Sequence, residues 1–126
     1  VPRVLAEKVA CAVEVTREHH DYILNVAFNY GGRMEILRAV RRMIDDGISP
    51  DGLSEALFDR YLYTAGLGDM DFIIRTGGDE RLSNFFPWQA ARGFFHATKT
   101  YWPDFDESEL VKALIAYNRF FESLAQ

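Results

Sequence analysis

The chain has 126 residues, 48% of them hydrophobic and 26% charged, which is enough for one modest hydrophobic core and argues against more than one domain. Its net charge of -5 argues against nonspecific nucleic-acid binding, because nucleic-acid-binding domains carry clustered basic residues. One cysteine excludes an internal disulfide, and no apolar run is long enough to span a bilayer, so we expect a soluble, cytoplasmic protein.

The first predicted element is a surface helix over residues 2–19. Leu5, Val9 and Val13 recur at helical spacing behind a proline, which is favoured in the first turn of a helix. Cys11 lies inside this amphipathic pattern, so we expect a packed thiol and not a reactive one.

A strand and a second helix are predicted next. Residues 22–28 are apolar without a helical period and run into a glycine turn, which is typical of a buried strand. The helix after that turn ends near Gly47, and its apolar stripe is expected at Ile36, Val40, Met43 and Ile44.

The remaining chain alternates helices and strands. A short helix is predicted over residues 54–61, strands over 71–75 and 94–98, and a last helix after Asp106, whose spacing to Glu109 is that of a capping box. Strands separated by helices predict an α/β fold with a mainly parallel central sheet flanked by helices.

The most informative segment follows the strand that ends at Arg75, where a Gly-Gly turn leads to Arg81 and Ser83. Glycines let backbone N–H groups approach an anion, and two guanidinium groups and a hydroxyl add further donors, so the segment suits a diphosphate. Asp79 and Glu80 would repel an anion unless they face solvent, cap a helix or help to hold a divalent metal. The alternative is a hairpin-like turn with solvated charges.

A second loop at the end of a predicted strand, Asn29 to Arg33, has the same polarity. If the two strands are near neighbours, both loops open at the carboxyl edge of the sheet, where α/β proteins bind ligands, and Asn29 can share a ligand with Arg75. In the alternative interpretation, the glycines serve only to permit a tight turn, and Asn29 forms hydrogen bonds only to the backbone. The motif alone leaves both interpretations open.

Four blocks of sequence carry a family resemblance: LNVAFNYGGR from Leu24, YTAGL from Tyr63, IIRTGGDERLSNF from Ile73 and WPDF from Trp102. Together they resemble the cis-prenyltransferases of isoprenoid biosynthesis, such as undecaprenyl and dehydrodolichyl diphosphate synthases. The resemblance implies an undecaprenyl diphosphate synthase-like fold and an enzyme that condenses isopentenyl diphosphate with an allylic isoprenyl diphosphate. It also implies that the isopentenyl diphosphate headgroup binds to Arg75, Arg81 and Ser83 with the backbone of Leu82; Asn29 is added from the second loop.

The chain departs from this family in extent. It opens on Val1-Pro2-Arg3 without a methionine, at a point where the family has completed its first half. We therefore expect residues 1–126 to form the C-terminal half of a cis-prenyltransferase-like domain, and we do not expect this segment alone to be active. The family's other diphosphate loop, with its metal-binding aspartate, lies in the first half, so no catalytic residue is assigned here.

A second departure concerns the magnesium cofactor that the resemblance implies. Phe94 stands where the family usually carries an acidic residue that helps to bind Mg²⁺, and phenylalanine cannot coordinate a hard cation. The ligand set is therefore incomplete, and no metal ligand is assigned. Asp79, Glu80 and Asp104 are the nearest carboxylates in sequence that could compensate.

Two hypotheses remain open. The first is a prenyltransferase, either of the chain-elongating kind or a branching, head-to-middle relative with altered metal use. The second is a non-catalytic subunit derived from the family. The retained Arg75, Arg81 and Ser83 favour the first, and Phe94 favours the second. By resemblance we expect isoprenyl diphosphate substrates, a homodimer or a heteromeric partner in its place, and peripheral membrane association through the lipid product.

Overall fold

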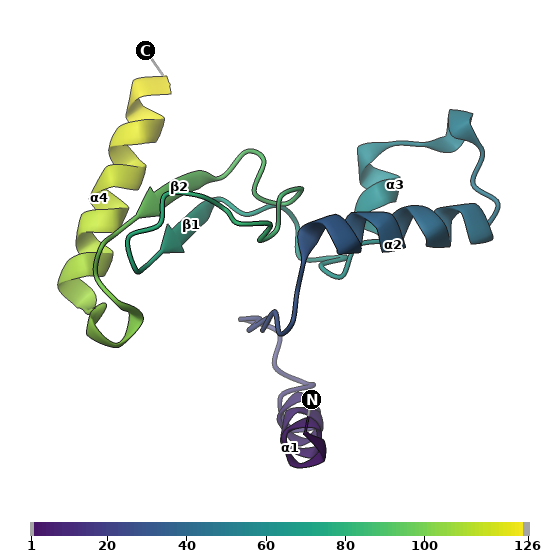
Figure 1. Ribbon diagram of the computed structural model, residues 1–126, viewed down its shortest axis with the longest axis horizontal. Coiled ribbons are helices and arrows are strands. Elements are labelled where there is room, and N and C mark those ends of the chain that lie inside the picture. Colours follow the sequence, from purple (N-terminus) through teal and green to yellow (C-terminus); the bar gives the residue numbers. More distant parts are fainter. Residues whose placement is uncertain (1, 125–126) are drawn as a thin grey trace.

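The computed structural model describes residues 2–124, which form two groups of elements and one helix that stands apart (Figure 1). The sheet and the last helix form one group, and the second and third helices lie in the other. The elements are α1 (Arg3–Val15), α2 (Gly32–Asp45), η1 (Pro50–Gly52), α3 (Glu55–Asp59), β1 (Phe72–Arg75), β2 (Phe94–Ala97), η2 (Trp102–Asp104) and α4 (Glu107–Leu124).

The sheet consists of β1 and β2, which lie parallel with Phe72 opposite Phe94. The strands predicted over residues 71–75 and 94–98 are confirmed, as is the α/β fold with parallel pairing. Parallel strands need a long crossover connection, which usually contains a helix. Here residues 76–93 cross over in a series of turns without a helix, and this connection carries the candidate binding loop.

Helix α4 covers one face of this sheet with aromatic side chains. The ring centroids of Phe94 and Phe120 lie 5.0 Å apart, and those of Phe72 and Tyr117 lie 5.1 Å apart. Each such pair contributes about 0.5–1.5 kcal/mol beyond the burial of its area. Because alternate residues of a strand face opposite sides of a sheet, Arg75 lies on the face away from α4.

The first turn of α4 is fixed by two carboxylates. Oδ1 of Asp106 accepts a hydrogen bond from the backbone N–H of Glu109 at 3.0 Å, which confirms one half of the predicted capping box. The Glu109 carboxylate turns instead to the hydroxyls of Thr98 and Thr100, at 3.2 and 3.0 Å, and to the Lys112 ammonium at 2.5 Å. Glu109 therefore clamps α4 to the end of β2.

This clamp should weaken in acid. The hydrogen bond from Lys112, followed by that from Thr100, holds the pKa of Glu109 below its ordinary value of 4.5. A carboxylate with a depressed folded-state pKa stabilises the fold above its unfolded pKa, and the stabilisation is lost as the pH falls through the folded-state pKa. We expect the NMR shifts of Thr98 and Thr100 to titrate below pH 4.5 and Glu109→Gln to remove the titration. An unchanged titration in the variant would contradict the clamp.

The strand predicted over residues 22–28 is not formed. These residues have no regular secondary structure, and most of their side chains are exposed. A strand needs a neighbour for its backbone hydrogen bonds, and the sheet of the described chain contains only β1 and β2. The expectation that two neighbouring strands bring both loops to one sheet edge is therefore wrong as well.

Two helices differ from expectation in what they bury. Helix α1 forms but ends at Val15, before the predicted end at residue 19. All its residues are exposed, Cys11 among them, because no other element of residues 2–124 covers this helix. Helix α2 buries Glu35, Ala39 and Met43, whereas Val40 and Ile44 of the predicted stripe are exposed. Among residues 2–124, the helices are all too short or too polar to cross a membrane.

Candidate functional site

Arg75 is the last residue of β1, and its guanidinium group is held by residues of the loop that follows. We term residues 75–83 the arginine loop. Nη1 of Arg75 donates to the backbone carbonyl of Arg81 and to Oγ of Ser83, which lies 2.8 Å away. Nη2 forms an ion pair with Oδ2 of Asp79 at 2.5 Å. With 26% of its side chain exposed, Arg75 is fixed by these bonds and still reachable from solvent.

Arg81 brings a second guanidinium group to the same point. Its Nη2 lies 3.4 Å from Oδ2 of Asp79, the oxygen that Arg75 also contacts. The two cations therefore converge on one carboxylate oxygen and do not face opposite flanks. The structure brings together the three side chains that the sequence singled out, Arg75, Arg81 and Ser83, and adds Asp79 between them.

The glycines of the arginine loop do not offer free N–H groups. Gly77 and Gly78 have φ angles of 92° and 86°, in the left-handed region that favours glycine. Their N–H groups donate to the carbonyls of Thr100 and Thr98 at 2.9 and 2.8 Å. The expectation that these N–H groups approach an anion is wrong, because they hold the turn to the segment after β2. These two N–H groups are therefore not available to a ligand.

A hollow of about 350 Å³ lies beside the arginine loop. Its polar wall is formed by Arg75, Thr76 and Ser83, and its apolar wall includes Ile73, Leu82, Phe85 and Phe95. Leu82 thus contributes its side chain to the lining, while its carbonyl accepts a hydrogen bond from the N–H of Phe85 at 3.0 Å. A ligand with an anionic head and a short apolar tail would match both walls.

Asn84 ties the arginine loop to the start of α2. Its Oδ1 accepts from the N–H of Arg33 and its carbonyl accepts from the N–H of Gly32, both at 2.9 Å. N–H groups in the first turn of a helix have no intrahelical acceptor, so Asn84 caps α2 from a distant part of the chain. Gly32 has no room for a side chain, because a Cβ there would lie 2.0 Å from Cδ of Pro87. The second predicted loop, Asn29 to Arg33, therefore contacts Asn84, the residue that directly follows the arginine loop, although the two loops do not share a sheet edge.

Asn84→Ala should loosen this junction. Loss of a capping side chain costs about 1 kcal/mol. Alanine also adds strain, since Asn84 has a φ of 65°, a left-handed conformation that alanine disfavours. Asn84→Gly lacks the cap but accepts the backbone conformation, so it should cost less than alanine. Urea denaturation followed by circular dichroism measures both, and two variants as stable as the parent would refute the capping role.

A buried carboxyl group, Glu35, lies behind this junction with 2% of the residue exposed. Its Oε2 accepts from the Tyr30 hydroxyl at 2.5 Å and from Nε2 of Gln89 at 3.1 Å, and its Oε1 accepts from the N–H of Tyr63 at 2.7 Å. Gln89 also donates to Thr64 at 2.8 Å. Burial, followed by the hydrogen bond to Glu35, raises the pKa of Tyr30 far above its usual value, so this hydroxyl stays a donor. Sequence reasoning missed this network.

Other predicted site residues lie apart from the arginines. Asn29 is exposed with a φ of 52°, and no hydrogen bond within residues 2–124 joins it to Arg75 or Ser83. Phe94, at the family's acidic position, packs against α4 on the opposite face of the sheet from Arg75. No three acidic, histidine or cysteine side chains in the described part of the chain lie close enough to hold a metal ion, so residues 2–124 do not form an all-protein metal site.

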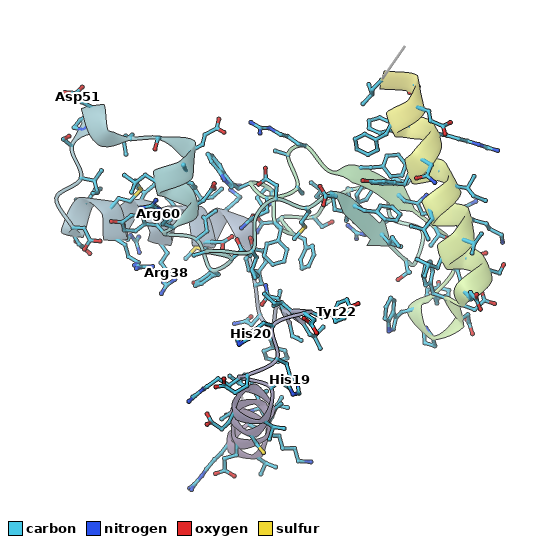
Figure 2. The ribbon with its side chains drawn as sticks, turned by 180° about the vertical axis from the view of Figure 1, so that it is seen from behind. His19, His20, Tyr22, Arg38, Asp51 and Arg60 are labelled. Carbon is cyan, nitrogen blue, oxygen red and sulfur yellow. The ribbon has the colours of Figure 1, made fainter. Side chains whose placement is uncertain are left out.

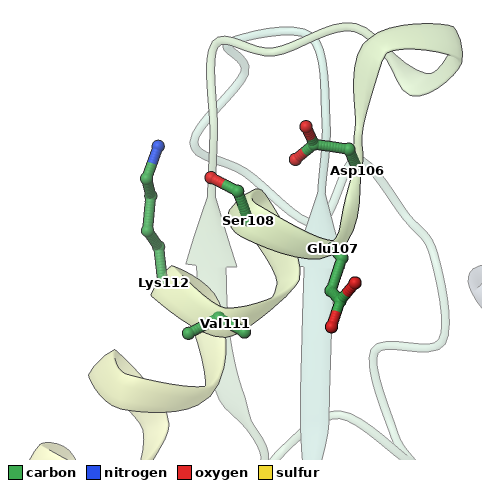
Figure 3. Close-up of a pocket in the computed structure, with 5 residues that line it drawn as sticks. All are labelled: Asp106, Glu107, Ser108, Val111 and Lys112. Atoms are coloured by element: carbon green, nitrogen blue, oxygen red, sulfur yellow. The ribbon is translucent and has the colours of Figure 1, made fainter.

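Two other surface features do not bring charged side chains together as the arginine loop does: the histidine pair after α1 and a depression at the start of α4. Figure 2 shows His19 and His20 on the segment that joins α1 to the rest of the chain. Figure 3 shows an open depression at the start of α4, where Glu107 and Lys112 extend in different directions; its lining is Asp106, Glu107, Ser108, Val111 and Lys112. The arginine loop is therefore the candidate site.

Comparison with known proteins shows the family. The family model described as "Putative undecaprenyl diphosphate synthase" matches residues 1–122, and the chain belongs to this prenyltransferase family. It is 44% identical over 127 residues to an isoprenyl transferase of Streptococcus pneumoniae. It is 38% identical over 123 residues to a tritrans,polycis-undecaprenyl-diphosphate synthase (geranylgeranyl-diphosphate specific) of Thermoplasma volcanium. Both alignments cover 94% of this chain, but the chain spans only 50% and 48% of those relatives, about half their length.

Two solved structures share the fold. Lavandulyl diphosphate synthase from Lavandula x intermedia, in complex with dimethylallyl diphosphate, matches 93% of this chain with a TM-score of 0.85 and 34% identity. A probable undecaprenyl diphosphate synthase from Campylobacter jejuni matches 94% with a TM-score of 0.79 and 27% identity. This chain covers 52% and 54% of those structures. The undecaprenyl diphosphate synthase-like α/β fold is thereby confirmed over about half of such a protein.

Proposed function

We propose that this chain supplies the isopentenyl diphosphate headgroup site of a prenyltransferase that condenses isopentenyl diphosphate with an allylic isoprenyl diphosphate. The observation that carries the proposal is the convergence of Arg75 and Arg81 next to Ser83, beside an apolar wall. A diphosphate calls for several charge-assisted donors, and an isopentenyl tail calls for apolar surface. Membership of the prenyltransferase family supports the same proposal.

In this proposal each residue has its own role. Arg75 is the preorganised donor, because three groups of the loop already orient its guanidinium. Arg81, whose side chain is 73% exposed, closes onto the phosphates from the solvent side. Ser83 donates its hydroxyl proton to a phosphoryl oxygen, Leu82 contributes backbone and lining, and Asn29 adds a contact from the second loop.

The proposed reaction breaks the allylic C–O bond, and diphosphate leaves with the electron pair. The double bond of isopentenyl diphosphate attacks the allylic carbon to form the new C–C bond, and a proton then leaves C2 of the isopentenyl unit to restore a double bond. The residues of the arginine loop hold and orient the isopentenyl diphosphate for this attack. No step in this account is assigned to a magnesium ion held by residues 2–124, because no three potential ligands cluster among them.

Head-to-middle, branching condensation is the second candidate function. Two observations favour it: the likeness to lavandulyl diphosphate synthase, at a TM-score of 0.85, and Phe94 at the usual acidic position. A non-catalytic subunit is the remaining alternative. We also propose that the full-length protein is a cytoplasmic homodimer that associates with the membrane through its lipid product. Light scattering would measure its oligomeric state.

Product analysis tests these functions. The full-length natural protein is incubated with magnesium and radiolabelled isopentenyl diphosphate, with dimethylallyl or geranylgeranyl diphosphate as the allylic partner. Linear products that contain the label support the proposed function. A branched product formed from dimethylallyl diphosphate alone supports head-to-middle condensation. No product, together with no binding of isopentenyl diphosphate, would leave only the non-catalytic subunit.

A further inference from the structure

The Asp79 carboxylate stands where the arginine loop would receive an anion. A single oxygen, Oδ2, contacts Nη2 of Arg75 at 2.5 Å and Nη2 of Arg81 at 3.4 Å. Both guanidinium groups therefore direct a terminal nitrogen at one negatively charged oxygen of the protein itself. A phosphoryl oxygen of a bound headgroup would present the same charge and the same acceptor geometry to those nitrogens.

We propose that Asp79 is a placeholder anion: it neutralises the two arginines in the ligand-free site and must swing away when a diphosphate binds. This inference rests on the proposed function and deepens it. Two anionic oxygens cannot share the same guanidinium nitrogens without repelling each other, so carboxylate and headgroup compete.

The local structure allows Asp79 to leave without disturbing the site. Its side chain is 49% exposed, so rotation moves the carboxylate into water. The preceding glycines stay anchored by their hydrogen bonds to Thr98 and Thr100. Arg75 keeps its bonds to the Arg81 carbonyl and to Ser83, so it remains aimed at the vacated position.

Competition by Asp79 makes the site selective for highly charged headgroups. A sulfate ion offers one tetrahedral group and must give up its water to displace a carboxylate that is already in place. A diphosphate offers two phosphoryl groups, so it can engage Arg75 and Arg81 together and offset the lost ion pairs. Asp79 is thus a specificity-determining residue, and it lowers the affinity for every anion while favouring the diphosphate.

Binding of inorganic pyrophosphate and of sulfate, measured by calorimetry on the full-length natural protein at fixed ionic strength without magnesium, tests the inference. Asp79→Asn and Asp79→Ala should bind pyrophosphate about tenfold more tightly than the parent. The affinity for sulfate should rise by a larger factor, so that the ratio of the pyrophosphate affinity to the sulfate affinity falls. Glu80→Gln is the matched control: it removes the same charge one residue along, and Glu80 forms no ion pair within residues 2–124.

The outcomes are separable. A gain in the Asp79 variants with less than a twofold change in Glu80→Gln supports the placeholder. An equal gain in affinity in Glu80→Gln would show only a general charge effect and would overturn the placeholder proposal. Weaker binding of pyrophosphate in both Asp79 variants would also overturn it, because Asp79 would then support the arginines and not compete with the ligand. If the parent and all variants fail to bind pyrophosphate and also isopentenyl diphosphate, the proposed function fails together with the inference.

Discussion

Replacing Arg75 with alanine should lower the affinity for isopentenyl diphosphate about 100-fold, because each charge-assisted hydrogen bond to the headgroup contributes about 1.5–3 kcal/mol. Arg75 is the best-oriented donor of the site, held by Ser83 at 2.8 Å and by Asp79 at 2.5 Å. Arg75→Lys keeps the charge but loses the planar fork, so we expect an intermediate loss of about tenfold. Isothermal titration calorimetry with isopentenyl diphosphate measures both variants.

Arg92→Ala is the control for this experiment. Arg92 lies on the same crossover connection, pairs with Glu55 at 3.3 Å, and has 76% of its side chain exposed. Exposed pairs of this kind contribute about 0–1 kcal/mol to stability, so the variant should fold and bind isopentenyl diphosphate like the parent. If Arg75→Ala and Arg92→Ala weaken binding equally, overall charge and not the arginine loop governs the affinity.

Replacing Glu35 with alanine should destabilise the protein by about 3–5 kcal/mol. The substitution removes the acceptor of the half-buried Tyr30 hydroxyl, of the Tyr63 N–H and of part of the buried Gln89 amide. Oε1 of Gln89, a buried acceptor, already lacks a donor within the described chain, so this network carries one unsatisfied polar atom before the substitution. Urea denaturation at neutral pH gives the free energy of unfolding from the midpoint and slope.

Two further variants define the cause of that loss. Glu35→Gln keeps an acceptor oxygen in place and should cost less than alanine. Glu55→Ala removes an exposed carboxylate of the same type, 73% exposed, and should change stability by less than about 0.5 kcal/mol. A loss in Glu35→Ala no larger than that in Glu55→Ala would show that the buried network does not hold α2 in place.

Local patterns in the sequence predicted the elements well where the forces are local. Both strands and the start of α4 follow from residues within a few positions of one another, such as Asp106 and the N–H of Glu109. The grouping of Arg75, Arg81 and Ser83 was also predictable, since all three lie on one short loop anchored at the end of a strand.

Contacts between distant segments could not be predicted in the same way. The Gly77 and Gly78 N–H groups looked free because their acceptors, Thr100 and Thr98, lie beyond the crossover. Residues 22–28 have the composition of a strand, but a strand exists only where a neighbour supplies hydrogen bonds. The signal for the buried network was one acidic residue, Glu35, on the stripe of α2 that also carries buried apolar side chains.

A crystal structure of the full-length natural protein with isopentenyl diphosphate tests the central claim most directly. The account predicts the diphosphate within hydrogen-bonding distance of Arg75, Arg81 and Ser83, the isopentenyl tail against Leu82 and its apolar neighbours, and the Asp79 carboxylate turned away from both guanidinium groups. A headgroup bound elsewhere, with Asp79 still paired to both arginines, would contradict it.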